Sequence, residues 1–288
     1  MPEQQQTLTI QQALDLAVQH HTAGRLSDAE SIYNQILQSD PDQPVALHLL
    51  GVIAHQVGNN DIAVDLITKA LAIKPDYAEA HNNLGNAFKD LGELDEAVVS
   101  YHKAIAIKPD YAEAHYNLGS ALRELGKLDE AVASYNKALA INPDYADAHN
   151  NLAGTLKELG RLEDSVDSYH KAIDINPELA DAHTNLGNVL KDLGQFSKAK
   201  AAYDRGFYIN HGGPWYNAAT FADGDGAGMG LPTGKVSTST FKLRDTIDQL
   251  EYLIAKGRID SSFQRMADRY RAVLTEIKQK EKPEAVIK

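Results

Sequence analysis

The amino-acid sequence predicts an all-α protein in which tandem helix pairs stack into a solenoid, and three observations support this prediction. The segment PDYAEAHNNLG begins at Pro75 and returns in closely similar form at Pro109, Pro143 and Pro177, each time 34 residues further on. Apolar residues recur three and four positions apart inside each repeat, which is the spacing of one helix face. Glycine and proline separate these runs at fixed positions, where helices end. A fixed period of this length is typical of a repeat protein.

The repeat frame divides the chain into four parts. An N-terminal tail at 1–9 precedes six expected repeats, at 10–43, 44–77, 78–111, 112–145, 146–179 and 180–211. A glycine-rich linker is expected at 212–240 and a C-terminal α-helical hairpin at 241–288. The hairpin is predicted from two amphipathic runs, the second of which opens at Asp260, a favourable N-cap residue.

The third repeat shows why each unit is expected to hold two helices. Apolar residues at helical spacing predict a first helix over 78–91, which ends at Gly92. The second helix is predicted over 94–107, and Pro109 follows it because proline neither donates to the helical ladder nor fits beside the preceding turn. Small residues recur where the two helices must approach closely, at Gly51, Gly85, Gly119, Ala153 and Gly187. Tyrosines are expected to fill the space between the helices, at Tyr33, Tyr101, Tyr135, Tyr169 and Tyr203.

This pattern resembles the tetratricopeptide repeat (TPR) family, which shares the period, the order of small and large residues and the closing proline. The resemblance implies a right-handed α-solenoid whose first helices line a concave surface that binds other proteins. The chain departs from the family at the start of the first helix, where histidine replaces the frequent tryptophan at His81, His115, His149 and His183. Successive helices pack about 8–10 Å apart, so one metal ion could bridge two of these histidines at best. They are therefore interpreted as packing residues, and no metal site is expected.

A column of asparagines on the first helices is the leading candidate for a binding site. Its members are Asn83, Asn117, Asn151 and Asn185. An amide both donates and accepts, so it can bond a peptide backbone whatever the peptide's side chains. The column resembles the asparagine ladder of the O-linked N-acetylglucosamine transferase superhelix, which implies backbone contacts to a threaded polypeptide. Asn86 and Tyr116 are included in the predicted site. The alternative is that the asparagines bond water or a neighbouring helix.

A second column carries positive charge and is also predicted to contact the peptide. It consists of Lys89, Arg123, Lys157 and Lys191, and an acidic residue follows each of them. If this column lines the concave surface, its charge would steer an approaching partner. The alternative is that this column is a solvated face of the helices.

The composition and the motifs argue against several classes of function. The formal net charge of −12 argues against nucleic acid and anionic membranes as partners, because both require clustered basic residues. The glycine-rich stretch at 224–230 satisfies neither a dinucleotide nor a phosphate-loop motif, and no catalytic motif is found, so neither an enzyme nor a cofactor is expected. Cysteine is absent and no signal peptide is visible, which favours a cytoplasmic protein.

The sequence therefore predicts a protein–protein interaction scaffold that binds an extended peptide or a partner protein in a concave groove. The alternative is a non-catalytic substrate-recognition arm of a larger enzyme, either a glycosyltransferase or a 2-oxoglutarate-dependent hydroxylase. That alternative depends partly on the segment FKLRDTIDQLEYLI, which resembles segments that join TPR arrays to downstream prolyl-hydroxylase-like domains. Self-association into homo-oligomers is a further hypothesis.

Overall fold

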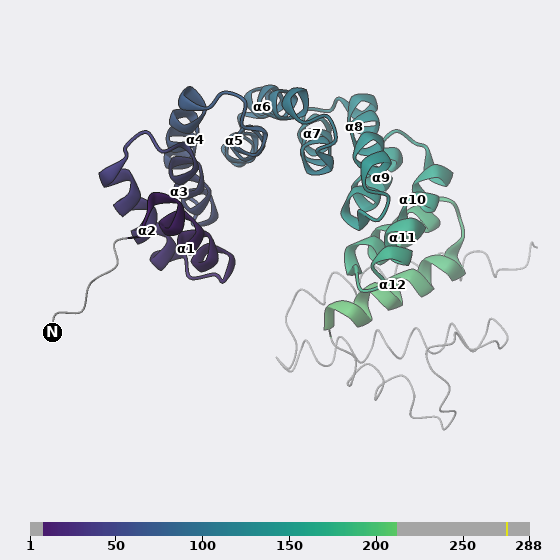
Figure 1. The fold of residues 1–288 in the computed structure, drawn as a ribbon. Helices are drawn as coiled ribbons and strands as arrows, with labels where there is room; N and C mark the ends of the chain where they lie inside the picture. The colour runs from purple at the N-terminus through teal and green to yellow at the C-terminus, as the bar shows by residue number, and fades with distance from the viewer. Residues whose placement is uncertain (1–7, 212–274, 276–288) are drawn as a thin grey trace, which may run out of the picture. The chain divides into compact units, whose positions relative to one another are not determined.

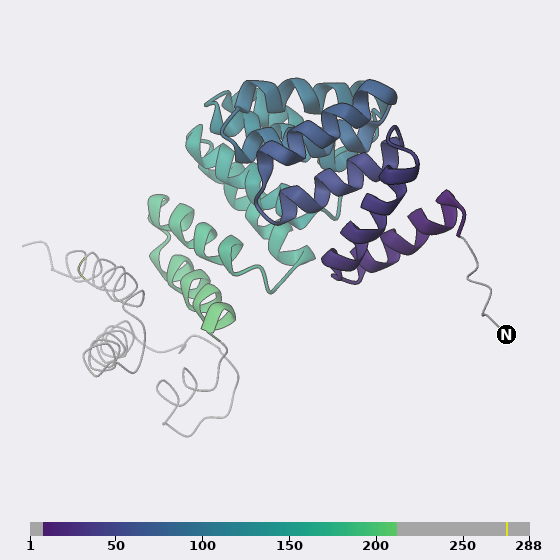
Figure 2. The ribbon, with the colours of Figure 1, turned by 90° about the vertical axis from the view of Figure 1, so that its left-hand side faces the viewer.

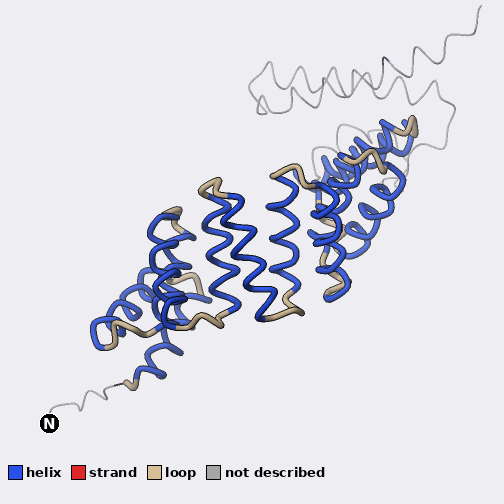
Figure 3. The backbone as a smooth tube through the Cα atoms, turned by 90° about the horizontal axis from the view of Figure 1, so that it is seen from above, coloured by secondary structure: helices blue, strands red, loops and turns tan. Residues whose placement is uncertain are grey.

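The computed structural model describes residues 8–211 and Thr275. They form twelve α-helices with turns between them and no strand (Figure 3). The helices are α1 (Ile10–Thr22), α2 (Leu26–Ser39), α3 (Pro44–Gln56), α4 (Asn60–Ile73), α5 (Ala78–Asp90), α6 (Leu94–Ile107), α7 (Ala112–Glu124), α8 (Leu128–Ile141), α9 (Ala146–Glu158), α10 (Leu162–Ile175), α11 (Ala180–Asp192) and α12 (Phe196–His211). The predicted linker and C-terminal hairpin lie outside the described residues, apart from Thr275.

The chain divides into two compact units, Met1–Pro177 and Glu178–Lys288. In the first unit, α1 to α10 form five antiparallel pairs. The first helix of a pair packs against its own second helix and against the second helix of the preceding pair. Figures 1 and 2 show these pairs stacked in chain order, with α3, α5, α7 and α9 on the inner side of an arc and α4, α6 and α8 on its outer side. In the second unit, α11 packs against α12 as a sixth pair. The predicted all-α repeat fold is confirmed.

Glycine ends the first helix of each repeat in the same way. The predicted helix over 78–91 ends one residue earlier, at Asp90, because Leu91 is its C-cap. Gly92 follows with a φ of +81°, a left-handed conformation that costs glycine nothing and other residues about 1 kcal/mol or more. The amides of Gly92 and Glu93 then donate back to the carbonyls of Lys89 and Phe88, both over 2.9 Å. This is the Schellman arrangement, which satisfies carbonyls that the helix end would leave unpaired.

The core of each pair depends on a close approach between a glycine and a large side chain. Tyr101 of α6 is fully buried, and its ring lies where a Cβ on Gly85 of α5 would come within 2.5 Å of it. Tyr135 and Gly119 form the same contact one repeat later, at 2.8 Å. Tyr33 and Tyr169 are buried in their own repeats, as predicted for this column.

Candidate functional site

The asparagine column runs along the inner helices, and each member that the first unit contains bonds the first helix of the preceding repeat. Asn83 Nδ2 donates to His48 Nε2 over 2.9 Å, which joins α5 to α3. Asn117 Nδ2 donates to Asn82 Oδ1 over 3.1 Å, and Asn151 Nδ2 donates to the Tyr116 hydroxyl over 2.9 Å. In every case the partner lies 35 positions earlier. Asn185 lies on α11, in the second unit.

These bonds fix the position of each side-chain amide and leave some of its hydrogen-bonding groups unused. A carboxamide has two N–H donors and an acceptor oxygen, and the bond to the first helix of the preceding repeat uses one donor. Asn83, Asn117 and Asn151 are each half-buried, so part of each side chain remains accessible. On α5, Asn83 shares a helix face with Asn86 and Asp90, three and seven positions further on. That face is distinct from the one on which Leu84 and Phe88 pack into the core.

Two further residues of the predicted site have structural partners. Asn86 accepts a hydrogen bond from the Tyr101 hydroxyl through Oδ1, over 2.8 Å, and so satisfies the polar end of a buried ring. Tyr116 accepts from Asn151 and lies beside Tyr145, with ring centroids 4.9 Å apart. Asn86 therefore supports the pairing of α5 with α6, whereas Tyr116 is the hydrogen-bond acceptor for Asn151 of the asparagine column.

The predicted cation column forms ion pairs between successive first helices. Lys89 Nζ lies 3.8 Å from Glu124 Oε1, and Arg123 Nε donates to Glu158 Oε1 over 2.9 Å. The same relation of 35 positions joins His55 to Asp90, over 2.8 Å. A basic residue of one repeat thus meets the acidic residue of the next. These groups are partly exposed, and such pairs contribute roughly 0.2–1 kcal/mol each. Lys157 lies on α9 and Lys191 on α11.

Tyrosines and lysines lie together in the turns between repeats, an arrangement that the sequence interpretation missed. Lys74 Nζ lies 4.4 Å from the centroid of the Tyr77 ring. One repeat later, Lys108 Nζ lies 4.8 Å from the Tyr111 centroid and 3.6 Å from Glu79 Oε1. Attraction between a cation and an aromatic face operates within about 6 Å. The repeated lysine and tyrosine of the IKPDY segments were the signal that could have shown this contact.

The histidine column bonds the turns that join the repeats. His81 and His149 use Nε2 to bond the carbonyls of Pro75 and Pro143, over 2.9 and 3.1 Å. Burial lowers the pKa of both imidazoles, so the neutral form is favoured. The described part of the chain contains no group of three histidine, aspartate or glutamate side chains arranged to hold a metal ion. None of its helices is long and apolar enough to cross a membrane.

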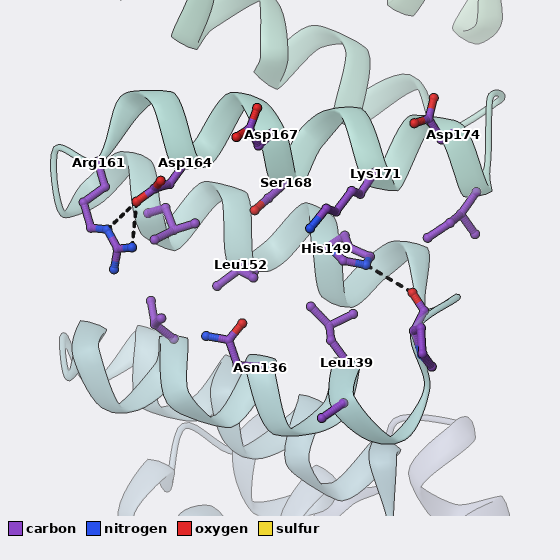
Figure 4. Close-up of a pocket in the computed structure, with 15 residues that line it drawn as sticks. Asn136, Leu139, His149, Leu152, Arg161, Asp164, Asp167, Ser168, Lys171 and Asp174 are labelled. Atoms are coloured by element: carbon purple, nitrogen blue, oxygen red, sulfur yellow. Dashed lines mark hydrogen bonds and ion pairs between the residues drawn. The ribbon is translucent and has the colours of Figure 1, made fainter.

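A groove of about 720 Å³ lies between two outer helices, α8 and α10, with α9 beneath it (Figure 4). Leu139, Leu152 and other apolar side chains form part of its lining, and Asp164, Asp167 and Lys171 lie along its α10 side. Asn136 on α8 is exposed at this groove. It is an asparagine outside the inner column.

The paired helices match known repeat models over residues 58–210. A model described as TPR repeat matches residues 58–92, 85–122, 119–160 and 155–194, and a second, described as Tetratricopeptide repeat, matches residues 180–210. The chain belongs to the tetratricopeptide repeat family. No curated protein matches the sequence.

Several solved TPR structures are similar to this chain. TTC0263 from Thermus thermophilus is 27% identical, with a TM-score of 0.52 over 63% of this chain and 99% of that protein. MamA is 26% identical, with a TM-score of 0.52 over 57% of this chain and 96% of MamA. YrrB is 24% identical, with a TM-score of 0.51 over 59% of this chain and 88% of YrrB, and is described as a TPR protein with an unusual peptide-binding site. TPR proteins are generally scaffolds for protein–protein interaction and are typically non-catalytic.

Proposed function

We propose that this TPR protein is an interaction scaffold that binds an extended peptide along the inner helices, with the asparagine column contacting the peptide backbone. One observation carries the proposal. Asn83, Asn117 and Asn151 each donate a hydrogen bond to the first helix of the preceding repeat, with the same sequence separation, and these bonds hold three amides in a row. An amide held in place before binding loses less conformational entropy when a ligand arrives.

The spacing of the column suits an extended chain. Neighbouring helices pack about 8–10 Å apart, and an extended chain advances about 3.3–3.6 Å per residue. One asparagine would therefore meet about every third residue of a threaded peptide. The likeness of this column to the asparagine ladder of the O-linked N-acetylglucosamine transferase superhelix supports the same mode of binding. YrrB, which shares the fold, is described as having an unusual peptide-binding site, which supports peptide binding as a function of this architecture.

The proposal is tested with a defined probe. Random dodecapeptides displayed on phage are selected against the full chain, and the affinities of selected peptides are measured by fluorescence anisotropy. A variant carrying Asn83→Ala, Asn117→Ala and Asn151→Ala is compared with wild type. Each net hydrogen bond contributes about 0.5–1.5 kcal/mol, so the triple variant is expected to bind roughly tenfold more weakly or worse.

The matched control is Asn136→Ala, which removes an asparagine from the outer groove and leaves the inner column intact. Its affinity for the same peptides should equal that of wild type. Helical circular dichroism at the binding temperature establishes that each variant is folded, since the triple substitution also removes bonds between repeats. Equal affinities of the triple variant and wild type for the selected peptides would sink the proposal.

A further inference from the structure

Two successive turns of the first unit hold a lysine against a tyrosine. Lys74 lies over Tyr77, and Lys108 lies over Tyr111. Lys108 also pairs with Glu79 of the preceding first helix, with 3.6 Å between Nζ and Oε1. One ammonium group is thus held by an aromatic ring and by a carboxylate. The repeat itself therefore contains an internal example of how this arrangement binds a cation.

The next turn, between α8 and α9, has the tyrosine and the carboxylate but lacks the lysine. Tyr145 corresponds to Tyr111, and Glu113 corresponds to Glu79, but Asn142 stands where Lys108 would recur. Asn142 carries no charge, and its Oδ1 accepts a hydrogen bond from the backbone amide of Asp144 within the turn. Within the described residues, Glu113 accepts a hydrogen bond from Asn82 over 3.2 Å but has no ion pair corresponding to that of Glu79.

Two more residues at this turn favour a positively charged ligand. The ring of Tyr116 lies 4.9 Å from that of Tyr145, at an interplanar angle of 36°, so the third turn has a second ring beside the first. Asp147 lies in the first turn of α9 and adds a second carboxylate. Burial raises the pKa of Tyr145 to about 12, with Tyr116, Glu113 and Asp147 adding to the effect. The two carboxylates therefore place negative charge near the Tyr145 ring.

This cluster is accessible and adjoins the predicted peptide path. Glu113 and Asp147 are exposed, and Tyr116 and Tyr145 are half-buried, so a ligand can reach both the carboxylates and the rings. The Tyr116 hydroxyl accepts the hydrogen bond from Asn151, which connects the cluster to the asparagine column. A peptide that contacts Asn151 would bring its side chains to this turn.

We propose that Glu113, Tyr116, Tyr145 and Asp147 form a cation subsite, which binds the side chain of one lysine or arginine of the ligand peptide. The inference rests on the proposed function and deepens it, because it assigns side-chain specificity to an inner surface that otherwise contacts the peptide backbone. The bound cation occupies the place that Lys108 occupies one repeat earlier, against an aromatic face and beside a carboxylate.

A titration with single amino acids tests the subsite without a peptide. Nα-acetyl-arginine amide and Nα-acetyl-lysine amide are added to the full chain, and the ring resonances of Tyr145 are followed by NMR. The neutral isostere Nα-acetyl-norleucine amide is the ligand control. The expected result is a saturable shift with the two cationic compounds, none with norleucine, and none with either cation in the Asn142→Lys variant, which supplies the chain's own lysine. Equal responses to norleucine, or an unchanged response in that variant, would overturn the subsite.

Peptides from the phage selection give the second readout. They should share a lysine or arginine, and Asn142→Lys should weaken their binding roughly 5- to 20-fold, the combined effect of an exposed cation–π contact and an ion pair. The converse variant Lys108→Asn removes a lysine outside the subsite and exposes a second ring, so it should not weaken this binding. If the triple asparagine variant binds normally while Asn142→Lys weakens binding, the backbone proposal fails and the subsite stands. If selected peptides depend on the asparagines but show no basic residue, the subsite fails and the proposed function stands.

Discussion

His48 should make the stability of the first unit depend on pH. Its imidazole is 3% exposed and lies edge-on to Tyr77, with ring centroids 4.7 Å apart. Asn83 donates to Nε2, so Nε2 must be an unprotonated acceptor, and Nδ1 carries the proton that is donated to the Tyr77 hydroxyl over 3.0 Å. Protonation of Nε2 would set an N–H against the Asn83 amino group and break the first bond of the column.

The size of the loss in unfolding free energy follows from the pKa of His48 in the folded chain. Burial lowers the pKa of His48 from 6.5 to about 4, so the folded chain resists a proton that the unfolded chain accepts. Stability is therefore fully present above pH 6.5, falls as the pH drops from 6.5 towards 4, and levels off below that range. One pKa unit corresponds to about 1.4 kcal/mol, so the loss amounts to about 2–3 kcal/mol by pH 4.5.

The assay compares wild type with His48→Asn. Asn82 holds the equivalent position one repeat later and accepts from Asn117, so asparagine should keep an acceptor for Asn83 without the titration. Unfolding free energies from urea are measured at pH 7.5 and pH 4.5 for both proteins. Wild type should lose about 2–3 kcal/mol more than the variant between these pH values, because other titrating groups contribute equally to both. Equal losses, or an NMR titration of His48 with a pKa near 6.5, would refute the reasoning.

Three further changes test the packing of the repeats. Gly119→Leu places side-chain atoms against the Tyr135 ring, where even a Cβ would come within 2.8 Å, and should lower the free energy of unfolding in urea by about 1–3 kcal/mol; an unchanged value would contradict the close approach. Gly92→Ala forces a side chain into a backbone with a φ of +81° and should cost about 1 kcal/mol in the same measurement, whereas no loss would show that the helix end adapts freely. Arg123→Ala removes the ion pair with Glu158 and should cost at most about 1 kcal/mol, less at high salt; a loss of several kcal/mol that salt does not reduce would show that the pair is not the surface contact described here.

The fold could be predicted because the period of the repeat and the residues that end its helices are visible in the sequence. Gly92 and Pro109 define the limits of a helix pair, and the predicted second helix, Leu94–Ile107, agrees with the structure at both ends. The first helix ended one residue early, since a pattern of apolar residues does not distinguish the last helical residue from the cap. Residues 212–274 and 276–288, which include the predicted linker and hairpin, lie outside the described structure.

Contacts between repeats were harder to predict than the repeats themselves. The sequence places Lys89 and Glu124 in separate repeats, and only the rotation from one helix pair to the next decides that they meet. For the same reason, the asparagines could be recognised as a column and a bond to a neighbouring helix was one alternative, whereas the partners His48, Asn82 and Tyr116 could not be derived. The cation subsite was missed because its signal is a single difference, Asn142 in place of Lys108, within segments that are otherwise nearly identical.

The most direct test of backbone recognition is an N-methyl scan of one selected peptide. Each position is N-methylated in turn, which removes one backbone N–H and leaves every side chain in place, and the affinity for the full chain is measured. If the acceptor oxygens of Asn83, Asn117 and Asn151 bind the backbone, affinity should fall at positions spaced about three residues apart and change little between them. An affinity that is insensitive to N-methylation, and that depends only on side-chain identity, would contradict the account.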